Sequence, residues 1–386
     1  MESAISSPRP KKHTDPEEEK KGDPEALILQ GHISALFAFE VGYEVSLEKL
    51  ANLLPSVPVQ PLSPKKLTPT FAQYNRPPRV LNLGDCPGPF GDTGQVRATL
   101  FDFGVVSLAY RWTLAKEHGT LLADLPVISQ HLYQSNLVAK ARDQVKELVE
   151  RIKPAIIRPN LSSIVEDYYL FVIERLGPSF EAGELFKKYR SVLAQTLRFE
   201  TLSLSSEQQD DALRQKLSYY ENDLLLIDWN AAIIYDQDYE DAANVLELLN
   251  VELLEARYID SELDQRIQEH ANLAHGGTGW PVPLRTPFRK AIQDLGELRI
   301  ESGLLAERLG NSLKLIGDLY LARVYSTAAE RFYLQQWQKT ISDKLDTIDI
   351  FHHLVTERIR TAQSQTLELA VILLILVELF VALLKH

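Results

Sequence analysis

The sequence has a single cysteine, Cys86, and fewer basic residues than acidic ones. One cysteine excludes an internal disulfide bond and a metal cluster held by several cysteines. The 41 lysines and arginines stand against 53 aspartates and glutamates, which gives a formal net charge of −12. Binding a nucleic acid through its phosphates requires clustered lysine and arginine, so a nucleic-acid partner is not expected.

The N-terminus lacks the apolar stretch of a secretory signal peptide. It also carries too many acids for a mitochondrial transit peptide, which is typically rich in arginine and poor in carboxylates. Proline, lysine and glutamate are frequent in residues 1–25 instead. A segment of this composition buries too little apolar surface to offset the entropy of ordering. We therefore expect residues 1–25 to form a disordered tail.

The long apolar run of the chain lies at its C-terminus. From Leu367 to Leu384 the sequence is LELAVILLILVELFVALL, in which sixteen of the eighteen residues are apolar and the exceptions are Glu368 and Glu378. A run of about this length can cross a ~30 Å hydrocarbon core as a helix. The run predicts a transmembrane span within a C-terminal anchor at residues 366–386.

A span in this position predicts a single-pass, tail-anchored membrane protein, with the lipid bilayer as a partner and the bulk of the chain on the side of synthesis. Each Leu, Ile, Phe or Val contributes roughly −0.3 to −0.6 kcal/mol and a central charge costs roughly 2.5 to 3.5 kcal/mol, so the balance favours insertion. Glu378 lies deep in the run and is expected to contact a neighbouring span helix. The alternative is a core helix whose carboxylates are capped or paired.

Strand-like and helix-like stretches alternate irregularly over residues 26–235, which predicts an α+β domain. Nine prolines between residues 55 and 89 exclude a helix there and predict an irregular crossing segment. The remaining stretches carry period-two or period-3.6 patterns. Strands are predicted at residues 27–41, 96–114 and 167–176, with a strand pair or one long strand at 223–235. Helices are predicted at 121–151, 181–196 and 205–220.

Residues 236–365 are predicted to be helical and coiled-coil-like. Apolar residues recur at intervals of four and three in two stripes, and a helix pair packed along both stripes is the simplest way to bury them. The first stripe is Leu246, Leu249, Leu253, Ala256, Leu263 and Ile267, with Asp260 interrupting it. The second stripe, the helix seam, is Ile341, Leu345, Ile348, His352, Val355 and Ile359. The predicted fold is thus an α+β N-terminal domain, a long-helix region and one C-terminal transmembrane helix.

His352 is the polar member of the seam, and such a residue can set helix register or oligomeric state. The alternative is a partly buried histidine with its hydrogen bonds satisfied. Because His353 is adjacent to it in the sequence, the two rings point about 100° apart on a helix and cannot share a metal ion as an i, i+4 pair can.

Two further motifs are weak candidates for chemistry. Residues 276–279 are Gly-Gly-Thr-Gly, but no Gly-Lys-Ser/Thr follows, so a helix stop and turn is expected rather than a phosphate loop. Asp236, Asp238 and Asp241 could bind a divalent cation, but the sixth position of a calcium loop should be glycine and here is Asp241. Acids at a helix N-terminus explain this cluster better. No metal, cofactor or catalytic residue is expected.

At the C-terminus, Thr366 to Phe380 contain a Leu-Glu pair, nine mostly apolar residues and a second glutamate. Residues 344–346 (Lys-Leu-Asp) and residues 101–106 (Phe-Asp-Phe-Gly-Val-Val) complete the pattern. In these features the chain resembles a divergent member of the required-for-meiotic-nuclear-division family, the domain of unknown function 155 group. The resemblance covers residues 30–384, with Leu369 in place of the family's usual aromatic residue.

The resemblance implies a role in mitochondrial translation support, meiosis or cytoskeletal behaviour, and a mitochondrial membrane location for a eukaryotic chain. No enzyme activity is settled for that family, so the resemblance supplies a class of protein and not a mechanism. The leading hypothesis is therefore a membrane-anchored scaffold that self-associates as a homo-oligomer through its C-terminal helices, with a protein partner that the sequence does not identify. The alternative is an enzyme or nucleotide-binding module with its site near Asp228, Trp229 and Asn230. A third hypothesis is a protein whose last helix belongs to its core.

Overall fold

The structure is a computed structural model, and the residues that it describes are 25–54, 59–61, 77–115, 119–275 and 319–384, with the single residues 296, 300 and 303. The predicted disordered tail lies outside the described residues except for Glu25. The predicted glycine turn at 276–279 also lies outside them.

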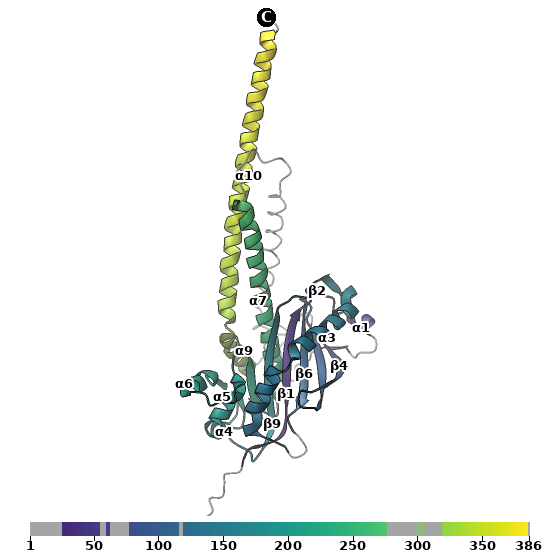
Figure 1. The fold of residues 1–386 in the computed structure, drawn as a ribbon, viewed down its shortest axis with the longest axis vertical. Coiled ribbons are helices and arrows are strands. Elements are labelled where there is room, and N and C mark those ends of the chain that lie inside the picture. The colour runs from purple at the N-terminus through teal and green to yellow at the C-terminus, as the bar shows by residue number, and fades with distance from the viewer. Residues whose placement is uncertain are drawn as a thin grey trace, which may run out of the picture.

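A large mixed β-sheet dominates the N-terminal part of the chain (Figure 1). The strands are β1 (Leu27–Glu40), β2 (Gly42–Val45), β3 (Val59–Pro61), β4 (Arg79–Pro87), β5 (Thr93–Leu100), β6 (Val105–Thr113), β7 (Thr120–Leu121), β8 (Ile156–Pro159), β9 (Val165–Gly177), β10 (Gln215–Leu217), β11 (Leu224–Ile227) and β12 (Ala231–Tyr235). The order in the large sheet is β10-β11-β12-β9-β1-β6-β5-β4-β3, and β7 pairs with β1. β2 and β8 do not belong to this sheet and pair with each other in a separate two-stranded sheet. The pair β9–β12 is parallel, and the other pairs are antiparallel.

Helices cover both faces of this sheet. They are α1 (Leu50–Leu53), α2 (Leu125–Gln134), α3 (Leu137–Ile152), α4 (Ala182–Lys188), α5 (Arg190–Arg198), α6 (Ser206–Ala212), α7 (Glu240–His275), α9 (Leu319–Arg331) and α10 (Leu334–Leu384). The first face packs against α2, α3, α4 and α5, and the second face packs against α7 and α9. Strand β1 serves both faces because successive side chains point to opposite sides: Phe37 and Phe39 belong to the first core, and Leu36 belongs to the second.

Most predicted strands of the N-terminal region are present. The stretches predicted at 27–41 and 167–176 form β1 and β9, and 223–235 forms the hairpin of β11 and β12. The helix predicted over 205–220 is shorter, because α6 ends at Ala212 and the chain then pairs with β11 as β10.

The segment between residues 55 and 89 departs from its prediction, because its described residues contain two strands, β3 and β4. Pro61 and Pro87 are the last residues of these strands. Proline lacks an N–H group and is tolerated at strand ends, where fewer ladder hydrogen bonds are lost. Proline density therefore excluded a helix but did not exclude strands between the prolines.

α7 and α10 lie side by side and form a long stalk on the sheet domain (Figure 1). The first part of α7 packs on the sheet, and its later part packs on α10, where Ala256, Ile259 and Leu263 meet Ile341 and Ile348. Leu345 of the seam is partly buried in the same cluster, and Lys344 Nζ lies 2.6 Å from carboxylate oxygens of Asp260 and Asp264. The side chains of the seam residues His352, Val355 and Ile359 lie outside the described ones.

The C-terminal apolar run is the last part of α10, and Leu367, Glu368, Glu378 and Leu384 are all exposed on it. Within the described residues, no helix combines the length and the apolar character that crossing a membrane requires. The two glutamates limit the unbroken apolar stretch to nine residues, which at ~1.5 Å per residue is about 14 Å of a ~30 Å core. The prediction of a transmembrane helix is therefore wrong, and with it the tail-anchored topology and the membrane location, mitochondrial or other.

Candidate functional site

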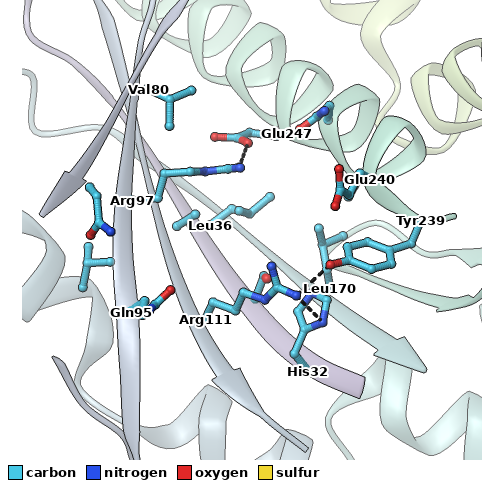
Figure 2. A pocket seen from close by; sticks show the side chains of 16 residues that line it. His32, Leu36, Val80, Gln95, Arg97, Arg111, Leu170, Tyr239, Glu240 and Glu247 are labelled. Carbon is cyan, nitrogen blue, oxygen red and sulfur yellow. Dashed lines mark hydrogen bonds and ion pairs between the residues drawn. The ribbon is translucent and has the colours of Figure 1, made fainter. Parts of the chain in front are cut away.

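A cavity of about 420 Å³ lies between the second face of the sheet and the beginning of α7 (Figure 2). Strands β1, β4, β5, β6 and β9 form its floor, and the first turns of α7 form its roof. The lining residues are His32, Ser34, Leu36, Val80, Asn82, Gln95, Val96, Arg97, Ala109, Arg111, Leu170, Tyr239, Glu240, Ala243, Asn244 and Glu247. We refer to this cavity as the groove.

The strand register explains why polar side chains gather in the groove. Gln95 of β5 stands opposite Arg111 of β6, and Arg111 stands opposite Ser34 of β1. Residues that stand opposite each other on paired strands point to the same face of the sheet. Arg97 lies two positions from Gln95 on β5 and therefore shares this face. The small side chain of Ser34 leaves the space that the larger polar side chains surround.

One arginine of the groove is neutralised by a carboxylate. Arg97 Nη2 lies 2.6 Å from Glu247 Oε2, in an ion pair between β5 and α7. The Glu247 side chain is only 5% exposed, and its Oε1 atom has no hydrogen-bond partner among the described residues. Charge-assisted bonds of this kind are the stronger class of hydrogen bond. The pair therefore ties the first turns of α7 to the sheet at one end of the groove.

The second arginine has neutral partners. Arg111 Nη2 donates to the Tyr239 hydroxyl at 2.7 Å and lies 3.1 Å from His32 Nδ1 (Figure 2). The guanidinium carbon is also 5.7 Å from the centre of the Tyr239 ring. Within the described part of the chain, Arg111 has no ion pair with a carboxylate. Its side chain is exposed, so it presents a full positive charge to the groove.

His32 is a neutral base at physiological pH. Burial lowers its pKa to about 3, and the nearby Arg111 charge adds to this effect. Its Nδ1 atom is 3.2 Å from Glu174 Oε1 as well as 3.1 Å from Arg111 Nη2. A neutral imidazole uses Nδ1 either as an acceptor from Arg111 or as a donor to Glu174, but not as both at once. The Glu174 contact is therefore a hydrogen bond at most and not an ion pair.

A second cavity of about 340 Å³ adjoins the groove on the same face. Three residues line both cavities, namely His32, Gln95 and Arg111. Glu174 lines the second cavity and accepts a hydrogen bond from Gln30 Nε2 at 2.8 Å. Arg111 thus stands at the junction of two adjoining spaces.

The described residues contain no group of three or more histidines, cysteines or acids placed to hold a metal ion. In the predicted cluster, Asp236 Oδ1 accepts a hydrogen bond from the Asp238 N–H at 2.9 Å, just before α7 begins. Asp241 lies in the first turn of α7. The arrangement is that of a turn leading into a helix N-terminus.

Asp228, Trp229 and Asn230, the site of the alternative hypothesis, lie at the turn between β11 and β12 and not in the groove. Asp228 is fully buried, and its Oδ1 accepts from Arg331 Nη2 at 2.6 Å. Its Oδ2 is 2.8 Å from Arg198 Nε. Trp229 is 54% exposed and Asn230 is buried.

Asp211 completes this ion-pair cluster. Arg331 Nη2 lies 3.0 Å from Asp211 Oδ2, and the hydrogen bond from Arg331 is the main cause that lowers the Asp211 pKa to about 2. The cluster joins α5, α6 and the β11–β12 turn to α9. We call these four residues, Arg198, Asp211, Asp228 and Arg331, the clamp, because their ion pairs hold together elements that are distant in the sequence.

The groove residues were not identified from the sequence, although a signal was present. Gln95 and Arg97 alternate with Val96 and Ala98, and Arg111 lies between the buried Tyr110 and Trp112. Polar residues at alternate positions of a strand usually mark a solvent-exposed face. The sequence does not show that α7 covers part of that face and turns it into a groove.

The chain matches the model of the family described as "Uncharacterized protein MJ0711, N-terminal domain" over residues 30–242. It is also similar to the uncharacterized protein MJ0711 of Methanocaldococcus jannaschii, with 25% identity over 272 residues. That alignment covers 67% of this chain and 82% of the relative. The matched residues 30–242 include every sheet residue that lines the groove, and they end in the first turn of α7.

These matches correct the family prediction. The resemblance to the required-for-meiotic-nuclear-division family is wrong, because the matched family is a different one. That resemblance depended most on the terminal pattern of leucines and two glutamates. Such a pattern arises easily in an apolar helix, whereas the matched region is the sheet domain.

Proposed function

The chain belongs to the MJ0711 N-terminal domain family, and from this premise we propose that it is an interaction scaffold whose copies associate through the end of α10. The proposed contact surface, called the terminal segment below, is residues 367–384. The observation that carries the proposal is the exposure of this segment's apolar side chains. The proposal involves protein contacts and no membrane.

The terminal segment exposes fourteen large apolar side chains, each between 47% and 73% exposed. Monomeric soluble proteins rarely expose contiguous apolar patches larger than a few hundred Å², and larger patches mark interaction surfaces. A helix that is apolar on all sides is normally buried by neighbours. The terminal segment therefore has the character of a surface that another protein covers.

The shape of α10 supports a second copy as the covering partner. Its 51 residues form one helix about 76 Å long, and the segment extends past the end of α7 (Figure 1). Because a continuous helix cannot fold back onto its own sheet domain, we expect the cover to come from another molecule. A second copy supplies an apolar segment of the same length. Ile341 and Ile348, nearer the start of the same helix, already pack against a helix in the seam with α7.

The test is the solution mass of the full chain, measured by analytical ultracentrifugation over a wide concentration range. We expect masses above the 43.7 kDa of one chain. The double variant Leu373→Glu/Leu376→Glu should shift the mass to that of a single chain, because burying two more carboxylates is costly. Gln365→Glu adds a similar charge just before the terminal segment and should leave the mass unchanged. A monomeric wild type, or a double variant that associates as the wild type does, would refute the proposal.

The alternative function, a ligand-binding or catalytic module near Asp228, has less support. The Asp228 carboxylate already faces two arginines, Arg331 and Arg198. A carboxylate held in this way is not available to a ligand without breaking the clamp. If the sheet domain binds a small molecule, the groove is the better place for it.

A further inference from the structure

The groove has the size and composition of a small-molecule site. Ligand pockets typically have volumes of about 300 to 1,000 Å³ and combine apolar walls with a few placed polar groups. The groove measures about 420 Å³ and carries apolar walls such as Leu36, Val80 and Leu170. The amides of Asn82 and Asn244 also line it, and Asn82 Oδ1 already accepts a hydrogen bond from the Gly84 N–H at 2.9 Å.

Arg111 is the polar group that points to the ligand class. Both of its hydrogen-bonded contacts use one nitrogen, Nη2, and both partners, Tyr239 and His32, are uncharged. The remaining guanidinium donors have no partner among the described residues. The planar guanidinium binds a carboxylate or phosphate through two parallel hydrogen bonds. By contrast, the Arg97 charge is already compensated by Glu247 at 2.6 Å.

The other charges of the two cavities limit how negative the ligand can be. Glu174 lines the adjoining cavity, and Glu240 lines the groove. Among the described residues, neither carboxylate forms an ion pair with Arg111, and both make the electrostatic potential around it more negative. A doubly charged anion would be repelled more strongly than a singly charged one, because the interaction scales with the product of the charges.

We propose that the groove binds a small polar molecule through a carboxylate held by Arg111, with the body of the molecule under the first turns of α7. The Gln95 amide stands opposite Arg111 on the neighbouring strand and supplies a further donor to the same carboxylate. Tyr239 and His32 position the guanidinium. Phosphate shares the oxyanion chemistry and is separated from carboxylate by the experiment.

The experiment is isothermal titration calorimetry of the full chain at fixed ionic strength. The probes are acetate, lactate, succinate and glycine, with inorganic phosphate and sulfate as the second group. We expect at least one of the carboxylates to bind and to bind more tightly than phosphate or sulfate. Stronger binding of phosphate or sulfate would overturn the carboxylate assignment, and no binding by any probe would overturn the site.

The variant Arg111→Gln should weaken carboxylate binding about tenfold or more, because a charge-assisted hydrogen bond is lost. The control is Arg151→Gln, which removes the same charge from α3 on the opposite face of the sheet and should leave the affinity unchanged. Equal affinity of Arg111→Gln and the wild type would overturn the proposal. If Arg111→Gln does not fold, Arg111→Lys is measured instead. Lysine keeps the charge but cannot form two parallel hydrogen bonds, so an unchanged affinity would contradict the proposed bidentate contact with the carboxylate.

Discussion

The sheet domain and the stalk differ in how their apolar surfaces are covered and their charged side chains are paired. In the sheet domain, helices cover both faces, and charged side chains such as Asp228 and Glu247 meet arginines from distant elements. In the stalk, Ile341 and Ile348 are buried against α7, whereas the terminal segment has exposed apolar side chains throughout. The sheet domain thus supplies its own partners, whereas under the proposed function a second copy covers the end of the stalk. Three experiments test whether the two regions differ in this way.

The largest effect is expected from Arg331→Ala, which removes the centre of the clamp between α9 and the sheet domain. It leaves the fully buried Asp228 without its closest partner. Removing one member of a buried ion pair typically costs about 3 to 5 kcal/mol. Chemical denaturation should therefore show a loss of this size in the free energy of unfolding. Arg323→Ala changes an exposed arginine of the same helix and should alter stability by less than about 0.5 kcal/mol.

A loss below about 1 kcal/mol in Arg331→Ala would contradict the clamp. The double variant Asp228→Asn/Arg331→Met provides a further check, because it removes both charges together. Replacing a buried ion pair by less charged groups costs less than breaking it. This double variant should therefore be more stable than Arg331→Ala alone.

A smaller and more local effect is expected from Leu263→Ala in the stalk. Leu263 is fully buried between α7 and α10, and truncating a buried leucine costs about 2 to 5 kcal/mol. If the stalk opens independently of the sheet, hydrogen exchange should accelerate in the later part of α7 and in α10 and stay slow in β1 and β9. The matched variant Leu249→Ala, at the α7–sheet contact, should accelerate exchange in the sheet domain as well. Identical exchange patterns in the two variants would show that sheet and stalk unfold as one unit.

The smallest effect at neutral pH is the contribution of His32 to stability, because it develops only as the pH falls below 6.5. Its pKa is lowered from 6.5 to about 3 in the folded chain, so the unfolded chain binds the additional proton between these values. Stability should therefore fall as the pH decreases from 6.5 towards 3, with a slope of at most about 1.4 kcal/mol per pH unit from this residue. Denaturation of the wild type and of His32→Gln across this range measures the slope by difference.

Other groups titrate in the same range but contribute equally to both proteins. Burial raises the Glu166 pKa from 4.5 to about 7, so the folded chain binds the additional proton between these values. Glu166 therefore stabilises the folded chain more as the pH falls from 7 to 4.5. The difference between the wild type and His32→Gln isolates the histidine. Parallel stability curves for the two proteins would contradict a neutral, buried His32.

Local patterns were sufficient for much of the sheet domain. The large apolar side chains Phe37 and Phe39 recur at every second residue, and this two-residue period identified β1. The polar groups near Asp228 were noticed, but their role was not, because the partner Arg331 lies 103 positions away in the sequence. The groove was missed for the same reason, since Gln95, Arg111 and Ser34 come together only through strand register. Register and distant pairing are not local properties of a sequence.

The amino-acid sequence alone was enough to predict the period-two pattern of the sheet, the period-3.6 pattern of the stalk and the apolar character of the last helix. It did so because those properties depend on neighbouring residues and on composition. Long-range packing determines which polar residues form the clamp, which polar residues line the groove and how much of α10 is covered. The reason is that each of these outcomes depends on the side chains that long-range packing brings within a few ångströms.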